Sequence, residues 1–137
     1  MRRVGVLLRA LLFAGSTAHA ADRAALENIR TEWQNAYGAI IYTVLADVKN
    51  VSATPVQYVK VRVALTDKNG QLVAERVGYN MGAEILQQED VRGSAEEKLK
   101  RVTPVAPGAQ DIVRISLDKS DIGKPFRSAT VTIVEVR

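Results

Sequence analysis

Few residues in this chain of 137 could do chemistry. Cysteine is absent, which excludes disulfides, thiol catalysis and thiolate-ligated metals. The one histidine, His19, lies in a segment that we expect to be removed from the mature protein. Its removal would exclude Ser-His-Asp and Cys-His catalysis and histidine-ligated zinc or copper. The composition therefore predicts a protein that is not an enzyme and that holds no cofactor or metal.

Carboxylates remain as candidates for acid–base or metal chemistry. Five of them lie within residues 84–97, but their spacing lacks the ligand pattern of a calcium loop. We interpret this run as a solvated loop and helix face. A hydrolase with two converging carboxylates is the least favoured hypothesis for this chain. The five acids are Glu84, Glu89, Asp90, Glu96 and Glu97.

Two short motifs have a structural interpretation. Ser116 and Lys119 match the Ser-x-x-Lys pattern of serine acyl-enzymes, which requires the start of a helix. Because Ser116 closes a predicted strand, we reject this chemistry. Asn50-Val-Ser52 is a glycosylation sequon, which we interpret as a turn.

Aromatic side chains could line a groove for a carbohydrate or a peptide. Aromatic residues at strand positions more often pack between sheets or shield an edge, so we favour that interpretation. A small-ligand or glycan site at Trp33 and nearby tyrosines is the alternative function. The aromatic residues considered are Trp33, Tyr37, Tyr42, Tyr58 and Tyr79.

The first twenty residues have the pattern of a secretory signal peptide. Arg2 and Arg3 precede an apolar stretch, interrupted by Arg9, and a small-x-small cleavage site ends at Ala20. Cleavage would leave residues 21–137 as a single domain with 16 basic and 15 acidic residues. That balance argues against nucleic-acid binding. We expect a periplasmic or secreted protein without a stable membrane span after cleavage.

The mature chain alternates apolar and polar residues over several segments, as β-strands do. A short helix is expected at residues 21–30. Turns are expected at residues 37–38 and at residues 67–70, and in the second of these Asn-Gly supplies the positive φ angles. This pattern predicts an all-β fold, an antiparallel β-sandwich of about six to seven strands. The strands are expected at residues 28–35, 39–50, 56–67, 71–79, 110–117 and 126–136.

Residues 80–108 form a long connection without strand alternation. Ser94 and Glu97 have the spacing of a capping box, so one short helix is expected near residues 94–101. Glu96 with Lys100, and Glu97 with Arg101, are spaced as i,i+4 ion pairs. Four apolar residues could fold this connection back over a sheet: Met81, Ile85, Leu86 and Leu99.

A candidate interaction surface follows from the strand pattern. Ile41 and Leu45 make the second face of strand 39–50 apolar, so either the chain or a partner must cover them. Tyr58, Lys60 and Arg62 could meet an acidic partner, although a solvated face is the simpler interpretation. Trp33 completes the set of candidate residues.

The strand and turn sequences at 48–52, 59–67, Gly70 and 107–108 resemble the FxLYD-type domain of bacterial envelope proteins. They also resemble a neighbouring domain of unknown function that often follows a zinc ribbon and a membrane span. In the naming motif Leu65 and Asp67 match, whereas Val63 replaces Phe and Thr66 replaces Tyr. The resemblance covers residues 39–136. It implies an immunoglobulin-like sandwich, an extracytoplasmic location and no catalytic residues; the chain lacks the cysteines of a zinc ribbon.

From the sequence we therefore expect a non-catalytic protein-interaction or structural module of the bacterial cell envelope, with an envelope protein as its partner. A glycan or small-ligand binder is the alternative.

Overall fold

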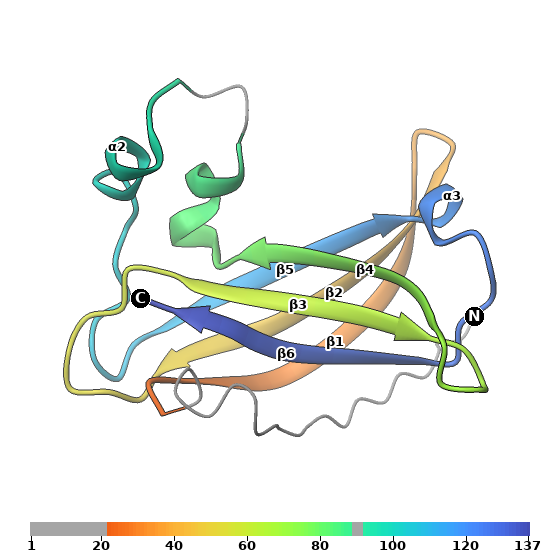
Figure 1. Ribbon diagram of the computed structural model, residues 1–137, viewed down its shortest axis with the longest axis horizontal. Coiled ribbons are helices and arrows are strands. Elements are labelled where there is room, and N and C mark those ends of the chain that lie inside the picture. The colour runs from red at the N-terminus through yellow and green to blue at the C-terminus, as the bar shows by residue number, and fades with distance from the viewer. Residues whose placement is uncertain (1–21, 89–91) are drawn as a thin grey trace.

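Two antiparallel sheets of three strands face one another in the computed structural model, which describes residues 22–88 and 92–137 (Figure 1). Six strands in two facing antiparallel sheets confirm the predicted fold class, an all-β sandwich of the immunoglobulin-like type. The predicted signal peptide lies outside the described residues. The first sheet has the order β1 (Ala24–Ala36), β2 (Ala39–Asn50), β5 (Gln110–Asp118), and the second β4 (Leu72–Tyr79), β3 (Val59–Thr66), β6 (Ser128–Val136).

The core lies between the sheets because each strand turns alternate side chains inward. In β2 the inward residues run from Tyr42 to Val48, and all are essentially inaccessible to solvent. Small branched side chains fill most of the remaining space, as suits a pleated surface. The core residues of the other strands include Val61, Val63, Leu65, Val113, Ile115, Leu117, Ala129, Val131 and Ile133.

The helix expected at residues 21–30 is wrong. β1 begins at Ala24, which pairs with Asn50, and the ladder with β2 continues to the pair Ala36–Ala39. A register shift between Glu27 and Arg30 interrupts the ladder, next to Asn28 with a φ of 53°. Pairing along β2 satisfies the backbone of this segment and outweighs its local helix propensity.

Both predicted hairpin turns are present. Tyr37 and Gly38 have φ values of 52° and 86°, as a two-residue type I′ turn requires. In the second turn only Gly70 has a positive φ, so Asn69 does not adopt the conformation that the sequence suggested. There the Asp67 carboxylate accepts hydrogen bonds from the backbone N–H groups of Asn69 and Gln71.

The connection between β4 and β5 contains the 3₁₀ helix η2 (Met81–Gln87) and the short helix α2 (Ala95–Leu99). The capping box of Ser94 and Glu97 is confirmed. The Glu97 carboxylate accepts a hydrogen bond from the backbone N–H of Ser94. The predicted i,i+4 pairs are not among the ion pairs of the described part of the chain. The helix is too short for them, since it ends at Leu99. None of the described helices is long and apolar enough to cross a membrane.

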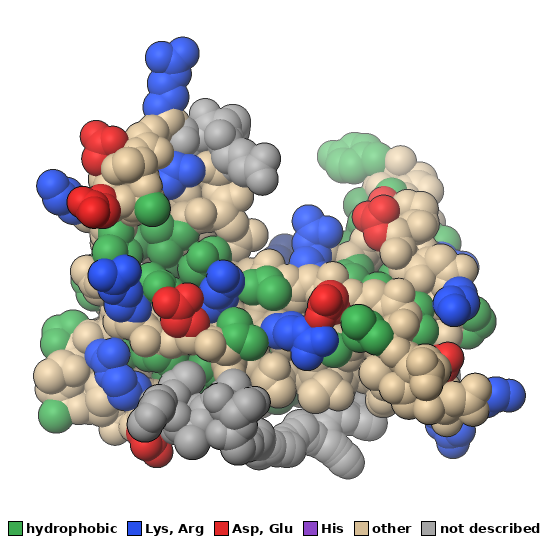
Figure 2. Space-filling model, viewed as in Figure 1, with side chains coloured by type: hydrophobic (Ala, Val, Ile, Leu, Met, Phe, Trp, Pro, Cys, Tyr) green, Lys and Arg blue, Asp and Glu red, His purple; other side chains and the backbone are tan. Residues whose placement is uncertain are grey.

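A second apolar cluster holds this connection against the sandwich, as the sequence predicted. Tyr58, Ala83 and Val102 form its buried centre, and Ile85, Leu86 and Leu99 pack around them. Met81 is exposed and takes no part. The connection and the β1–β2 hairpin therefore stand at opposite ends of the molecule, with a lower surface between them (Figures 1 and 2).

Candidate binding groove

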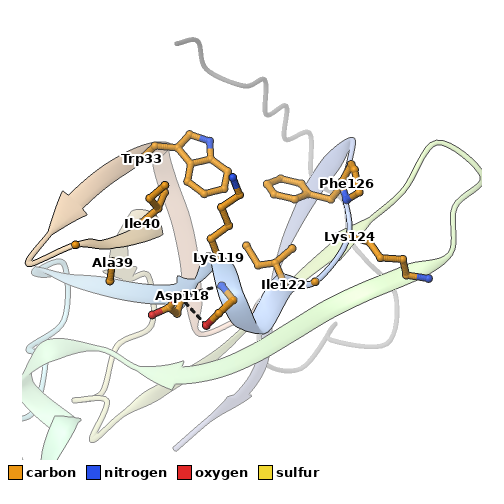
Figure 3. Close-up of a pocket in the computed structure, with 12 residues that line it drawn as sticks. Trp33, Ala39, Ile40, Asp118, Lys119, Ile122, Lys124 and Phe126 are labelled. Atoms are coloured by element: carbon orange, nitrogen blue, oxygen red, sulfur yellow. Dashed lines mark hydrogen bonds between the residues drawn. The ribbon is translucent and has the colours of Figure 1, made fainter.

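An open groove of about 870 Å³ lies at the hairpin end of the sandwich (Figure 3). One side is the β1–β2 hairpin, and the other is helix α3 (Lys119–Ile122) with the segment that leads into β6. The groove thus joins residues that are about ninety positions apart in the chain. Its lining residues are Trp33, Gly38, Ala39, Ile40, Asp118, Lys119, Ser120, Ile122, Gly123, Lys124, Pro125 and Phe126.

Two aromatic rings, Trp33 and Phe126, line this groove from its two sides, and the Tyr42 ring supports both. Trp33 of β1 pairs in register with Tyr42 of β2, and their ring centroids lie 4.9 Å apart. Phe126 packs edge-on against Tyr42 at 5.0 Å and lies 6.1 Å from Trp33. Tyr42 is buried, whereas Trp33 and Phe126 are half-buried and reach the groove. Such tilted ring pairs fix the ring positions more firmly than burial alone.

The polar residues of the groove come from the start of α3. The Asp118 carboxylate accepts hydrogen bonds of 2.9 Å from both the backbone N–H and the Oγ of Ser120. The backbone N–H of Ser120, and then its hydroxyl, hold the pKa of Asp118 below its ordinary value. In Figure 3 the Lys119 side chain extends toward the space between Trp33 and Phe126, whereas Lys124 points away. The groove thus combines an apolar wall with one inward-directed ammonium group.

The hydroxyl of Tyr42 makes no hydrogen bond of acceptable geometry although it is buried. Burial raises the pKa of Tyr42, and the nearby Thr31 side chain reduces this rise only in part. A buried hydroxyl without a partner costs free energy. The Tyr42 ring therefore stabilises the fold by packing against its neighbours, whereas its unpaired hydroxyl lowers the stability.

The carboxylate and serine candidates from the sequence do not come together in this groove. Asp118 is the only carboxylate that lines it, whereas a glycosidase uses two. Ser116 lies within β5 and its hydroxyl meets that of Thr43 at 3.0 Å, so it does not start a helix beside Lys119. Residues 22–88 and 92–137 bring no three metal-ligating side chains together.

The structure brings only Trp33, of the six predicted site residues, to this groove. Ile41 and Leu45 lie half-buried on the outer face of the first sheet. Leu45 lies between Arg30 and Arg114 in register, so its neighbours on that face are charged. This outer face is therefore not an open apolar surface.

The other three predicted residues lie toward the opposite end. Tyr58 is buried in the second cluster, and its hydroxyl donates a 2.7 Å hydrogen bond to Glu135. Burial, followed by the Glu135 carboxylate, raises the pKa of Tyr58. Lys60 lies over the ring of Tyr79, and Arg62 pairs with Glu75. A smaller pocket of about 350 Å³ adjoins Tyr58 and Tyr79.

Lys119, Ile122 and Phe126 were not among the predicted site residues: residues 118–125 were expected only to connect two strands, and Phe126 was expected to open the last strand, which begins at Ser128. The sequence feature that could have indicated Ile122 and Phe126 is that they are large and apolar in a segment otherwise rich in turn formers. A turn that hides apolar residues must lie against another element.

A family model described as "Protein of unknown function (DUF3426)" matches residues 21–126. No curated protein and no solved structure matches the chain significantly. The strand order and the groove are thus the features from which a function can be argued.

Proposed function

This chain belongs to the DUF3426 family of proteins of unknown function, and from that premise we propose that it is a non-catalytic protein-interaction module of the bacterial cell envelope. The observation that carries the proposal is the groove between the β1–β2 hairpin and α3, with an aromatic residue on each side and Lys119 directed into it. Aromatic and basic side chains around an apolar hollow are typical of sites that anchor a partner.

The location in the envelope rests on the predicted signal peptide and on the FxLYD-type resemblance. The family match starts at Ala21, the residue after the expected cleavage site, which supports this part of the proposal. On the face shown in Figure 2 basic and acidic side chains are interspersed rather than gathered by sign, which favours a protein partner over nucleic acid.

Site-specific photocrosslinking in intact cells tests the proposal. A photoreactive phenylalanine analogue replaces Ile40, which lines the groove and is partly exposed. The matched control carries it at Val134, which is equally exposed but lies on β6 and does not line the groove. We expect a discrete covalent product in the envelope fraction from position 40 and none from position 134. Equal or absent products at both positions would contradict the proposal.

A small ligand or a glycan in the same groove is the second candidate. It is favoured by Trp33, because indole rings commonly stack on apolar ligand faces and the groove volume suits a small molecule. Trp33 is the only tryptophan, so its emission reports directly on this groove. A saturable change in emission with an envelope glycan, with no crosslinked protein from position 40, would favour this candidate.

A further inference from the structure

Tyr37 is the most exposed large hydrophobic residue of the described chain, at the tip of the β1–β2 hairpin. Its φ of 52° lies in the left-handed region that side chains of its size rarely adopt. Backbone strain of this kind is found preferentially at functional sites. The ring thus projects from a two-residue turn without burial against the rest of the fold.

The groove lies directly beside this tip. Gly38, Ala39 and Ile40, the three residues after Tyr37, all line it. A projecting ring and a hollow therefore belong to the same end of one molecule. If two copies are related by a twofold axis, each ring faces the hollow of the other, and such a contact closes without forming a chain.

We propose that two copies of this chain associate end to end, with Tyr37 of each seated in the groove of the other. The groove offers this ring the faces and edges of Trp33 and Phe126, which suit tilted aromatic pairs. Lys119 extends toward the same space, where its ammonium group can lie against a phenol ring. The partner copy thus contributes a residue to the site, and the site is incomplete without it.

The size of this contact sets its expected strength. Each tyrosine buries roughly 200 Å² and covers a similar area of groove, so a symmetric pair buries about 800 Å². Contacts of that size are typical of weak, transient complexes. We therefore expect association at concentrations on the order of 10–1000 µM. The inference rests on the proposed function, because it names the occupant of the same groove.

Sedimentation velocity and Trp33 emission, measured over that concentration range on the purified protein, test the inference. The sedimentation coefficient is expected to rise with concentration, and the Trp33 emission to change in parallel. Tyr37→Gly removes the ring and relieves the positive φ, so it should weaken association by about tenfold or more while raising the midpoint of thermal unfolding. Tyr37→Phe keeps the ring and should keep the association.

The control variant is Leu72→Ala, which removes an exposed apolar side chain at the start of β4. It should leave association unchanged. A protein that stays monomeric at every concentration, or one that associates equally well as Tyr37→Gly, would overturn the inference. The inference would also be overturned if Trp33 emission changed when phosphatidylglycerol vesicles or glycans were added but did not change with protein concentration. If the protein is monomeric and the photoreactive residue at position 40 crosslinks to a different protein, the self-association is refuted and the proposed function is retained.

Discussion

The side-chain amide of Asn80 donates a 2.7 Å hydrogen bond to Oδ2 of Asp111, and this contact ties the end of β4 to β5 in the opposite sheet. Asn80 is fully buried, and its Oδ1 accepts from the backbone N–H of Val59. The same Asp111 oxygen accepts from the backbone N–H of Gly82 at 2.8 Å. One carboxylate thus fixes both the link between the sheets and the start of η2.

Asp111→Ala should lower the free energy of unfolding by about 2–3 kcal/mol, because two donors, one of them on a buried side chain, lose their acceptor. Urea denaturation followed by circular dichroism measures this loss. Asp22→Ala, which removes an exposed carboxylate, is the control and should change stability by less than about 0.5 kcal/mol. Equal effects in the two variants would refute the role assigned to Asp111.

Asn50→Ala should cost about 2–4 kcal/mol of unfolding free energy. Asn50 is buried; its Nδ2 donates to the carbonyl oxygens of Thr54 and Val105, and its Oδ1 accepts from the N–H and the hydroxyl of Ser52. Asn69→Ala, in the exposed second hairpin turn, should cost much less. The sequon begins at the last residue of β2, and the Ser52 N–H donates to Asn50 Oδ1 in the manner of an Asx turn.

The same burial makes Asn50 a poor glycan acceptor once the protein has folded. We expect the protein, secreted from a glycosylating host, to carry no glycan at Asn50, as intact mass spectrometry would show. Full occupancy of the site in a folded product would contradict the burial of this side chain.

Tyr42→Phe should leave stability at pH 7 unchanged or raise it slightly, because the deleted hydroxyl has no hydrogen-bond partner. The two proteins should diverge in alkali. The folded pKa of Tyr42 is raised above 10.0, so its contribution is fully present below pH 10 and is lost as pH rises toward the folded pKa. Chemical denaturation between pH 8 and pH 11 should show a smaller loss for Tyr42→Phe; coincident curves would exclude this explanation.

Gly82→Ala should destabilise the protein more than Gly78→Ala. A Cβ on Gly82 would lie 2.7 Å from the carbonyl oxygen of Thr103, which is backbone and cannot move easily. A Cβ on Gly78 would meet the Ile115 side chain at 3.0 Å, which can shift. We expect about 2–3 kcal/mol for Gly82→Ala and about 1 kcal/mol for Gly78→Ala, measured by urea denaturation. The reverse order would contradict the assigned packing.

A strand could be predicted from the sequence wherever its own residues alternated between apolar and polar. β2 shows a period of two along its whole length, and it has the predicted limits of residues 39–50. β1 was predicted only in part, because Ala24 to Leu26 favour a helix locally and become a strand through pairing with β2.

The site was less accessible to prediction because it depends on the register between strands. The apolar residues Ile41 and Leu45 suggested a docking face, but the charged neighbours of Leu45 come from β1 and β5, whose alignment no local pattern reveals. Trp33 was predicted as a candidate without its partner Phe126, which follows some ninety residues later and meets it only in the finished sandwich.

The position of Trp33 also determines what an observer of refolding would see. Its contact with Tyr42 spans a two-residue turn, and such hairpins close within about 1–10 µs. Its contact with Phe126 requires the opposite sheet, where β3 pairs with β6 across more than sixty residues, and pairings of that separation form slowly. The emission of the only tryptophan is therefore expected to change in two kinetic phases. The fast phase accompanies closure of the β1–β2 hairpin, and the slow phase accompanies the pairing of β6 with β3.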